Sequence, residues 1–128
     1  MPSTKTRVNK VANVVIPVAD QERALTFYVD TLGFEKRVDL PFGGKYRWIE
    51  VGLGDESTTI ALAPPPDGAP TGDNHTGITL QTDNIDGVHA RLRDAGVDVD
   101  AEIQRMGDPV PPMFWFRDPE GNTLLMVQ

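Results

Sequence analysis

The chain has 128 residues, of which 39% are hydrophobic, and a net charge of −7. This length and composition fit one domain, and no stretch approaches the roughly 20 apolar residues that a membrane-spanning helix needs. The acidic charge repels phosphate backbones and weakly favours a cationic small molecule, so we do not expect nucleic acid as a partner. Because no apolar stretch is long enough, we do not expect a membrane as a partner either. No cysteine is present, which excludes disulfides and thiolate sites and agrees with a cytoplasmic location. Residues 1–9 are expected to form a disordered polar tail, without the apolar segment of a signal peptide.

The first half of the chain predicts one strand–helix–three-strand module over residues 10–63. A β-branched run at 11–18 predicts the first strand. Asp20 is suited to cap a helix N-terminus, and Gly33 is suited to end that helix in the left-handed conformation. An apolar stripe at helical spacing predicts that the helix covers one face of a sheet. Further strands are predicted over 34–40, 46–52 and 58–63.

The second half repeats this plan over residues 74–128. A strand over 76–82 leads into a helix from Asp83 to Gly96, at the same spacing as in the first half. Strands are predicted over 97–104, 113–117 and 123–127, with a turn at 118–122. A proline- and glycine-rich connector over 64–73 separates the halves. Two tandem βαβββ modules predict an α+β fold with helices on one face of the sheet.

Short motifs distributed over the chain carry a resemblance to a known family. They are Pro17-Val18-Ala19-Asp20, Ala24-Leu25 with Phe27-Tyr28, Leu32-Gly33-Phe34, and Phe116-Arg117-Asp118-Pro119-Glu120-Gly121-Asn122. In their order, spacing and duplication the chain resembles the vicinal-oxygen-chelate superfamily of glyoxalase I, extradiol dioxygenases, and fosfomycin- and bleomycin-resistance proteins. The resemblance implies a curved, cup-like mixed sheet with helices on its outer face. It also implies a homodimer, in which modules pair either within one chain or across two.

The metal ligands of that superfamily have no counterpart in this chain. In the enzymes, His or Glu ligands occupy the first and last strands of both modules, and the resemblance places these positions at Asn13, Ala61, Gly77 and Leu125. None of the four is a His, Glu or Asp, and a neutral amide is a poor ligand for a divalent transition metal. We therefore expect no metal and no cofactor.

Glu50 and His75 are the candidates for acid–base chemistry. By strand alternation, Glu50 shares a face with Trp48. It either lies in a pocket, where it holds a cationic group or acts as a general base, or lies on the outward face and pairs with Arg47 or Lys45. His75 is either an acid–base group or displaced ligand near the pocket rim, or a solvated loop residue.

Aromatic and polar side chains on the predicted strands supply the binding candidates. Trp48 and Trp115, with Phe114 and Phe116, either form stacking walls for a planar or apolar ligand or belong to the core or a dimer interface. Side chains alternate between the two faces of a strand. Polar residues on the same face as the four ligand positions are therefore expected to face the cavity. The predicted ligand-binding residues are Asn13, Trp48, Glu50, Thr59, Ala61, Gly77, Thr79, Gln81, Met113, Trp115 and Leu125.

These candidates leave two main functions open. The first is a metal-free protein that binds and sequesters a cationic or aromatic organic molecule, as the bleomycin-resistance branch does, and we favour it. The second is an enzyme of glyoxalase or dioxygenase type, with atypical ligands or with Glu50 or His75 acting without metal. A housekeeping domain with a vestigial pocket is a third interpretation.

Overall fold

The computed structural model describes residues 6–65 and 69–128, so the expected tail and connector lie partly outside the described residues. The elements are β1 (Asn13–Pro17), α1 (Gln21–Thr26), the π-helix η2 (Phe27–Thr31), β2 (Glu35–Phe42), β3 (Tyr46–Gly52), β4 (Thr59–Ala63), β5 (His75–Gln81), α2 (Ile85–Asp94), β6 (Asp98–Val99), β7 (Met113–Arg117) and β8 (Thr123–Val127). They form two four-stranded mixed sheets, with strand orders β1-β4-β3-β2 and β5-β8-β7-β6. Both sheets therefore have the predicted βαβββ connectivity.

Each sheet buries one face under a helix and leaves the other face open. In the first sheet, Ile16, Ile49 and Leu62 are fully buried on the helix side. Their sequence neighbours point the opposite way because side chains alternate along a strand. In the second sheet, Phe114 and Leu124 are likewise fully buried on the helix side. The strands over 46–52, 113–117 and 123–127 have the predicted ends.

The helix ends follow the sequence signals with one exception. The Asp20 carboxylate accepts a hydrogen bond from the Arg23 backbone N–H at 3.0 Å, which confirms it as the cap of α1. Gly33 and Gly96 end the two helical segments with φ of 90° and 80°. The expected cap of α2 at Asp83 is wrong, because the helix begins one residue later and the Asn84 side chain accepts from the Gly87 N–H at 3.0 Å.

Two elements are less regular than predicted. The first helix passes into a π-helical turn at Phe27, which turns both Phe27 and Tyr28 toward the core. The strand predicted over 97–104 is reduced to Asp98–Val99 and one isolated bridge between Gln104 and Met113. The chain from Val99 to Gln104 is longer than the stretch of β7 that it faces, so it bends away from the sheet between these two pairings.

A cluster of polar side chains joins the two modules, and we call it the clamp. The Glu120 carboxylate accepts hydrogen bonds from the backbone N–H groups of Ala19 and Asp20 at 2.7–2.8 Å. The Tyr28 hydroxyl donates to buried Asp118 at 3.0 Å, and the Asn122 amide donates to the Pro17 carbonyl at 3.2 Å. Burial raises the pKa of the Tyr28 phenol above its usual range, and the adjacent Asp118 carboxylate acts in the same direction, so the phenol stays protonated.

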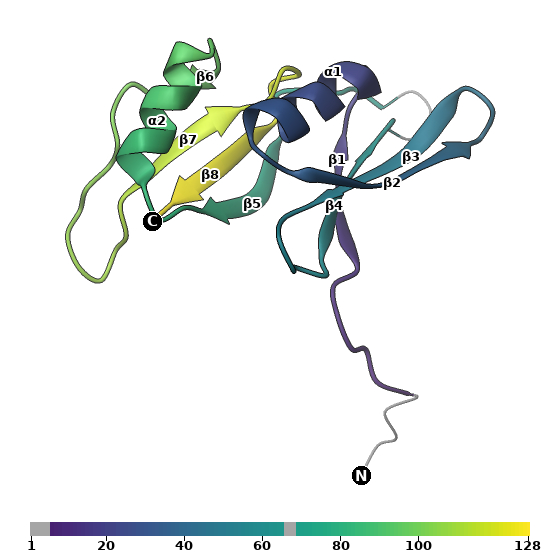
Figure 1. Cartoon of the computed structure of the whole chain (residues 1–128), viewed down its shortest axis with the longest axis horizontal. Coiled ribbons are helices and arrows are strands. Elements are labelled where there is room, and N and C mark those ends of the chain that lie inside the picture. Colours follow the sequence, from purple (N-terminus) through teal and green to yellow (C-terminus); the bar gives the residue numbers. More distant parts are fainter. Residues whose placement is uncertain (1–5, 66–68) are drawn as a thin grey trace.

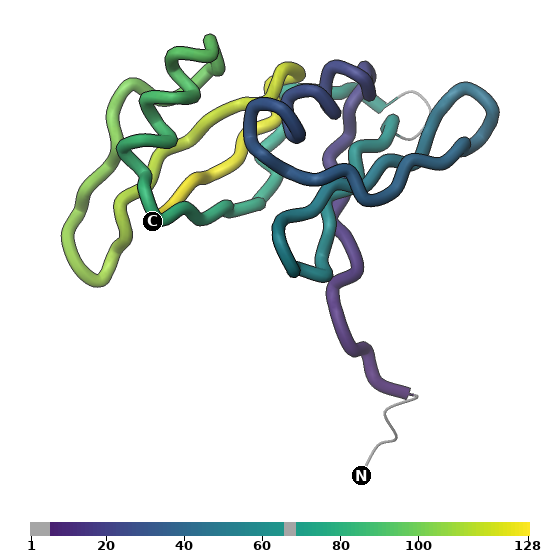
Figure 2. Tube along the Cα trace, in the orientation of Figure 1, coloured from purple at the N-terminus to yellow at the C-terminus, as the bar shows by residue number. Residues whose placement is uncertain are grey.

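The two modules share one hydrophobic core, to which both helices and both sheets contribute. Figure 1 shows the sheets side by side, with α1 and α2 on the same side of the molecule. Figure 2 shows the N-terminal stretch leaving the body of the protein before β1. The predicted α+β fold with helices on the outer face is confirmed, and within the described residues the sheets do not close into a barrel. Among those residues, no helix has the length and apolar character to cross a membrane.

Candidate functional site

The faces turned away from the helices carry the residues that the sequence singled out. Strand register assigns Asn13, Val15, Leu40, Phe42, Tyr46, Trp48, Glu50, Thr59 and Ala61 to one of them, which we call the first open face. It assigns His75, Thr79, Gln81, Met113, Trp115 and Leu125 to the other, the second open face. The predicted sharing of a face by Trp48 and Glu50 is thereby confirmed.

Glu50 is held by two neighbours on the first open face. The Trp48 indole Nε1 donates to Glu50 Oε2 at 2.7 Å. The Thr59 hydroxyl, on the adjacent strand β4, donates to Glu50 Oε1 at 2.6 Å. Each carboxylate oxygen therefore has one fixed donor, and each keeps further lone pairs for a ligand. The result is a negative charge fixed beside an indole ring.

These hydrogen bonds also set the charge state of Glu50. The Thr59 hydroxyl and then the Trp48 indole lower the pKa of the Glu50 carboxyl, and the Lys10 ammonium acts in the same direction against partial burial. Glu50 is therefore anionic at neutral pH. The alternative pairing of Glu50 with Arg47 is wrong, because Arg47 lies on the helix side and pairs with Asp39 at 2.9 Å and with Glu22.

Apolar side chains surround this carboxylate on the first open face. Phe42 packs edge-on against Trp48, with ring centroids 5.7 Å apart. Leu40 and Phe42 are 59% and 52% exposed, and Val15 and Tyr46 are also exposed. Val15, Leu40 and Phe42 were missing from the predicted site, although their parity with Trp48 across the strand pairs could have identified them. Asn13 is half-buried at the edge of the face, and Ala61 is fully buried opposite Glu50.

The second open face is built around Trp115. His75 is an exposed residue at the first position of β5, and its ring lies edge-on to that of Trp115, with ring centroids 5.7 Å apart. Thr79 and Gln81 are exposed, while Met113 and Leu125 are half-buried. Gly77 adopts a φ of 73° within an irregularity of β5, a conformation that favours glycine. Phe114 and Phe116 point into the core instead, so they do not line a binding surface.

The four positions that correspond to the superfamily's metal ligands do not fit a metal ion. Asn13 supplies one amide, and Ala61, Gly77 and Leu125 supply no ligand side chain. Nowhere in the described part of the chain do three His, Cys, Asp or Glu side chains come together in a way that could hold a metal. The side chains at these positions therefore give no basis for a metal-dependent step.

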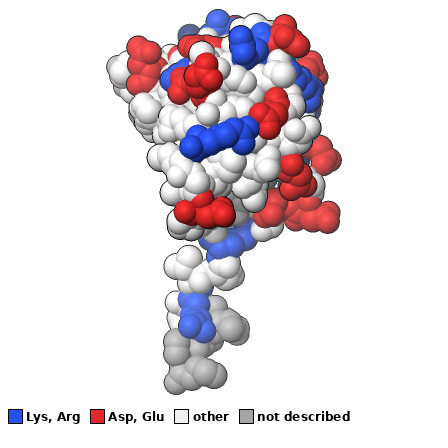
Figure 3. Space-filling model, turned by 90° about the vertical axis from the view of Figure 1, so that its left-hand side faces the viewer, with Lys and Arg blue, Asp and Glu red and all other residues white. Residues whose placement is uncertain are grey.

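The structure brings the predicted residues together in two groups and not in one. Trp48, Glu50 and Thr59 form the first, and His75 and Trp115 form the second. Within the described residues, no ring contact links the two tryptophans, and each has its aromatic neighbour in its own module. Figure 3 shows acidic and basic side chains spread over the side of the molecule that it presents, so the acidic excess does not form one patch there.

A fold with two helix-backed sheets, each with an open face, is the architecture of a known superfamily. A family model for the Glyoxalase/Bleomycin resistance protein/Dioxygenase superfamily matches residues 10–126. The chain belongs to this superfamily, and the resemblance seen in the sequence motifs is confirmed.

Individual relatives cover almost the whole chain. TnmS3, described as an antibiotic binding protein from Streptomyces sp. CB03234, is 35% identical with a TM-score of 0.80, covering 94% of this chain and 96% of that chain. A superfamily member from Sphaerobacter thermophilus DSM 20745 is 36% identical with a TM-score of 0.84, covering 94% and 97%. The uncharacterized protein YurT of Bacillus subtilis strain 168 is 30% identical over 93% of this chain and 98% of its own length.

Proposed function

We propose that this protein binds, and so sequesters, a planar organic molecule that carries a cationic or hydrogen-bond-donating group. The observation that carries this proposal is the Glu50 carboxylate fixed between Trp48 and Thr59 on an open face. An indole next to a fixed anion offers stacking area and a partner for a protonated amine. The similarity to an antibiotic binding protein supports a small-molecule ligand of this kind.

Binding suits this site better than acid–base catalysis. A general base works best when its pKa lies near the operating pH, whereas the hydrogen bonds from Thr59 and Trp48 lower the pKa of Glu50. Lowering the pKa of a carboxyl weakens it as a base but preserves its charge. Glu50 is therefore better suited to hold a cation than to accept a proton from a substrate.

We further propose that two copies of the chain complete the binding site. The first open face exposes Val15, Leu40, Phe42 and Tyr46, and apolar surface of this kind marks interaction sites. In the proposed dimer, the second open face of one copy covers the first open face of the other. Trp48 of one copy and Trp115 of its partner would then form the two walls of one cup.

Tryptophan fluorescence can test the ligand proposal, because the chain has two tryptophans and each open face carries one of them. A panel of planar polycyclic compounds, with and without an amino group, would be titrated into the protein. We expect amine-bearing members to change the fluorescence, and the variants Trp48→Phe and Trp115→Phe each to retain part of the response. Trp48→Ala and Trp115→Ala should each weaken binding by about 2 kcal/mol. Unchanged affinity in both would contradict the aromatic walls.

The dimer is tested by placing a charge in its proposed interface. Phe42→Glu should shift the protein toward the monomer and weaken ligand binding, because burying an unpaired carboxylate is unfavourable. Sedimentation velocity of both forms measures the shift. Met106→Glu serves as the matched control, because Met106 is 63% exposed and is not assigned to either open face. A wild-type protein that sediments as a monomer with bound ligand would exclude the shared cup.

A further inference from the structure

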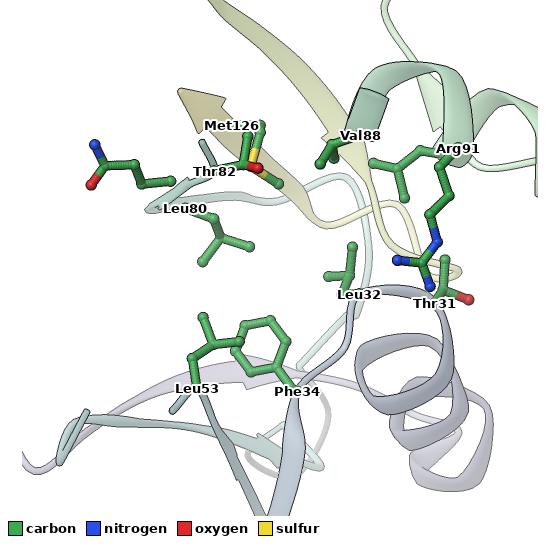
Figure 4. A pocket seen from close by; sticks show the side chains of 11 residues that line it. Thr31, Leu32, Phe34, Leu53, Leu80, Thr82, Val88, Arg91 and Met126 are labelled. Atoms are coloured by element: carbon green, nitrogen blue, oxygen red, sulfur yellow. The ribbon is translucent and has the colours of Figure 1, made fainter. Parts of the chain in front are cut away.

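A separate cavity lies between the two modules, on the side of the shared core. It has a volume of about 140 Å³ and receives side chains from both modules. Figure 4 shows Phe34 and Leu53 of the first module facing Leu80, Val88 and Met126 of the second across it.

The inner part of this cavity is apolar. Phe34, Leu92 and Met126 are almost fully buried, and the neighbouring Leu80 and Val88 are half-buried. The volume resembles that of a cavity of about 150 Å³ in another protein, which is lined by similar side chains and binds benzene. The interior therefore accommodates one compact apolar group, such as a single aromatic ring.

The rim of the cavity carries a cation, the Arg91 guanidinium, that forms no ion pair with a carboxylate of the described residues. Arg91 of α2 reaches across the opening toward Thr31, as Figure 4 shows. The hydrogen bond from its guanidinium to the Asp30 carbonyl oxygen is long, at 3.5 Å. Within residues 6–65 and 69–128, no carboxylate lies within ion-pair distance of this guanidinium, although the chain is strongly acidic. Most of its N–H donors are thus available to a ligand.

We propose that the inter-module cavity is a second ligand site, which takes a small carboxylate with a compact apolar group. The apolar group would occupy the space beside Phe34 and Met126. The carboxylate would accept hydrogen bonds from the Arg91 guanidinium, whose planar shape suits bidentate contact with a carboxylate. This site differs from the open faces in charge preference, although β5 and β8 contribute to it as well as to the second open face. It does not rest on the function proposed for those faces.

Methionine methyl NMR of the full chain distinguishes the two sites. Met126 lines the cavity, whereas Met113 belongs to the second open face. With methionine methyl groups labelled with carbon-13, benzoate is expected to shift the Met126 signal at millimolar concentration and to leave the Met113 signal in place. Benzamide, which has the same ring without the charge, is expected to bind more weakly. A benzoate response confined to Met113, or the absence of any response, would overturn the proposal.

Arg91→Gln tests the role of the guanidinium. It should weaken benzoate binding about tenfold, because it removes the charge-assisted hydrogen bonds, and should leave benzamide binding unchanged. Arg93→Gln is the matched control, since it removes the same charge from the same last turn of α2 at a residue that does not line the cavity. Both arginines are exposed, so both variants are expected to fold. Equal weakening by the two variants would show a general charge effect and overturn the assignment to Arg91.

Discussion

Replacing Asp118 with alanine is expected to lower the free energy of unfolding by about 4 kcal/mol, a large fraction of the stability of a small domain. Asp118 is 4% exposed, and its carboxylate accepts four hydrogen bonds. They come from the Tyr28 hydroxyl, the Glu120 and Asn122 backbone N–H groups, and the Asn122 amide, at 2.9–3.0 Å. Alanine would leave the buried Tyr28 hydroxyl and Asn122 backbone N–H without these partners, which costs more than losing the bonds themselves.

Urea unfolding of matched variants measures this loss. Tyr28→Phe removes one of the four donors and should cost about 1–2 kcal/mol, because Asp118 keeps the other three. Asp55→Ala is the control for the charge, since Asp55 is exposed, and it should stay within about 0.5 kcal/mol of the wild type. A similarly small effect for Asp118→Ala would mean that the clamp does not hold the two modules together.

Replacing Glu50 with glutamine is expected to weaken the binding of amine-bearing planar ligands by about tenfold or more. The amide keeps the shape of the side chain but removes the negative charge that Trp48 and Thr59 fix in place. A ligand with a hydroxyl in place of the amine should lose much less affinity on the same substitution. Isothermal titration of both ligands into both proteins measures the difference, and Glu35→Gln, at an exposed position of β2, is the control. If the two ligands lost affinity equally, Glu50 would not be the partner of a cation.

The pH dependence of ligand binding follows from the lowered pKa of the Glu50 carboxyl. Because the pKa of Glu50 is lowered in the folded protein, the carboxylate stays charged as the pH falls through the ordinary range of a glutamate, about 4.3. The affinity for a permanently cationic ligand should therefore hold through that range and decline only below it. Glu50 also contributes stability above its unfolded pKa, and this contribution is lost as the pH falls through the lowered folded value. A decline that begins well above the ordinary range would contradict this assignment.

Much of the fold was predictable because burial on one face imposes a period on the sequence. Strand-like runs rich in aromatic and apolar residues predicted Tyr46–Gly52 and Met113–Arg117 with their observed ends. Gly33 and Gly96 marked the helix ends through the left-handed conformation. The length of the strand predicted over 97–104 was overestimated. Only the pairing with β7 shows that the chain from Val99 to Gln104 is too long to follow that strand, and no local sequence pattern reveals this pairing.

For the candidate site, the sequence predicted only which side chains of one strand share a face of the sheet. Parity placed Trp48 and Glu50 on one face, and the structure adds that they are hydrogen-bonded to each other. The inter-module cavity could not be predicted, because it depends on how the two modules pack. In the sequence, Arg91 is not distinguished from any other basic residue in the last turn of a helix. The same holds for Asp118, whose partner Tyr28 lies 90 positions away.

The clamp also breaks the pseudo-twofold relationship between the modules. The corresponding turn of the first module lies between β3 and β4 and contains Gly54 and Glu56. Arg37 of the same module donates to the Gly54 and Glu56 carbonyl oxygens, so that turn is tied back onto its own sheet. The turn at 118–122 therefore makes contacts between the modules, whereas the side-chain hydrogen bonds to the Gly54 turn come from its own module. The halves are consequently not interchangeable, and a chain assembled from two first modules would lack the Asp118 and Glu120 contacts that join them.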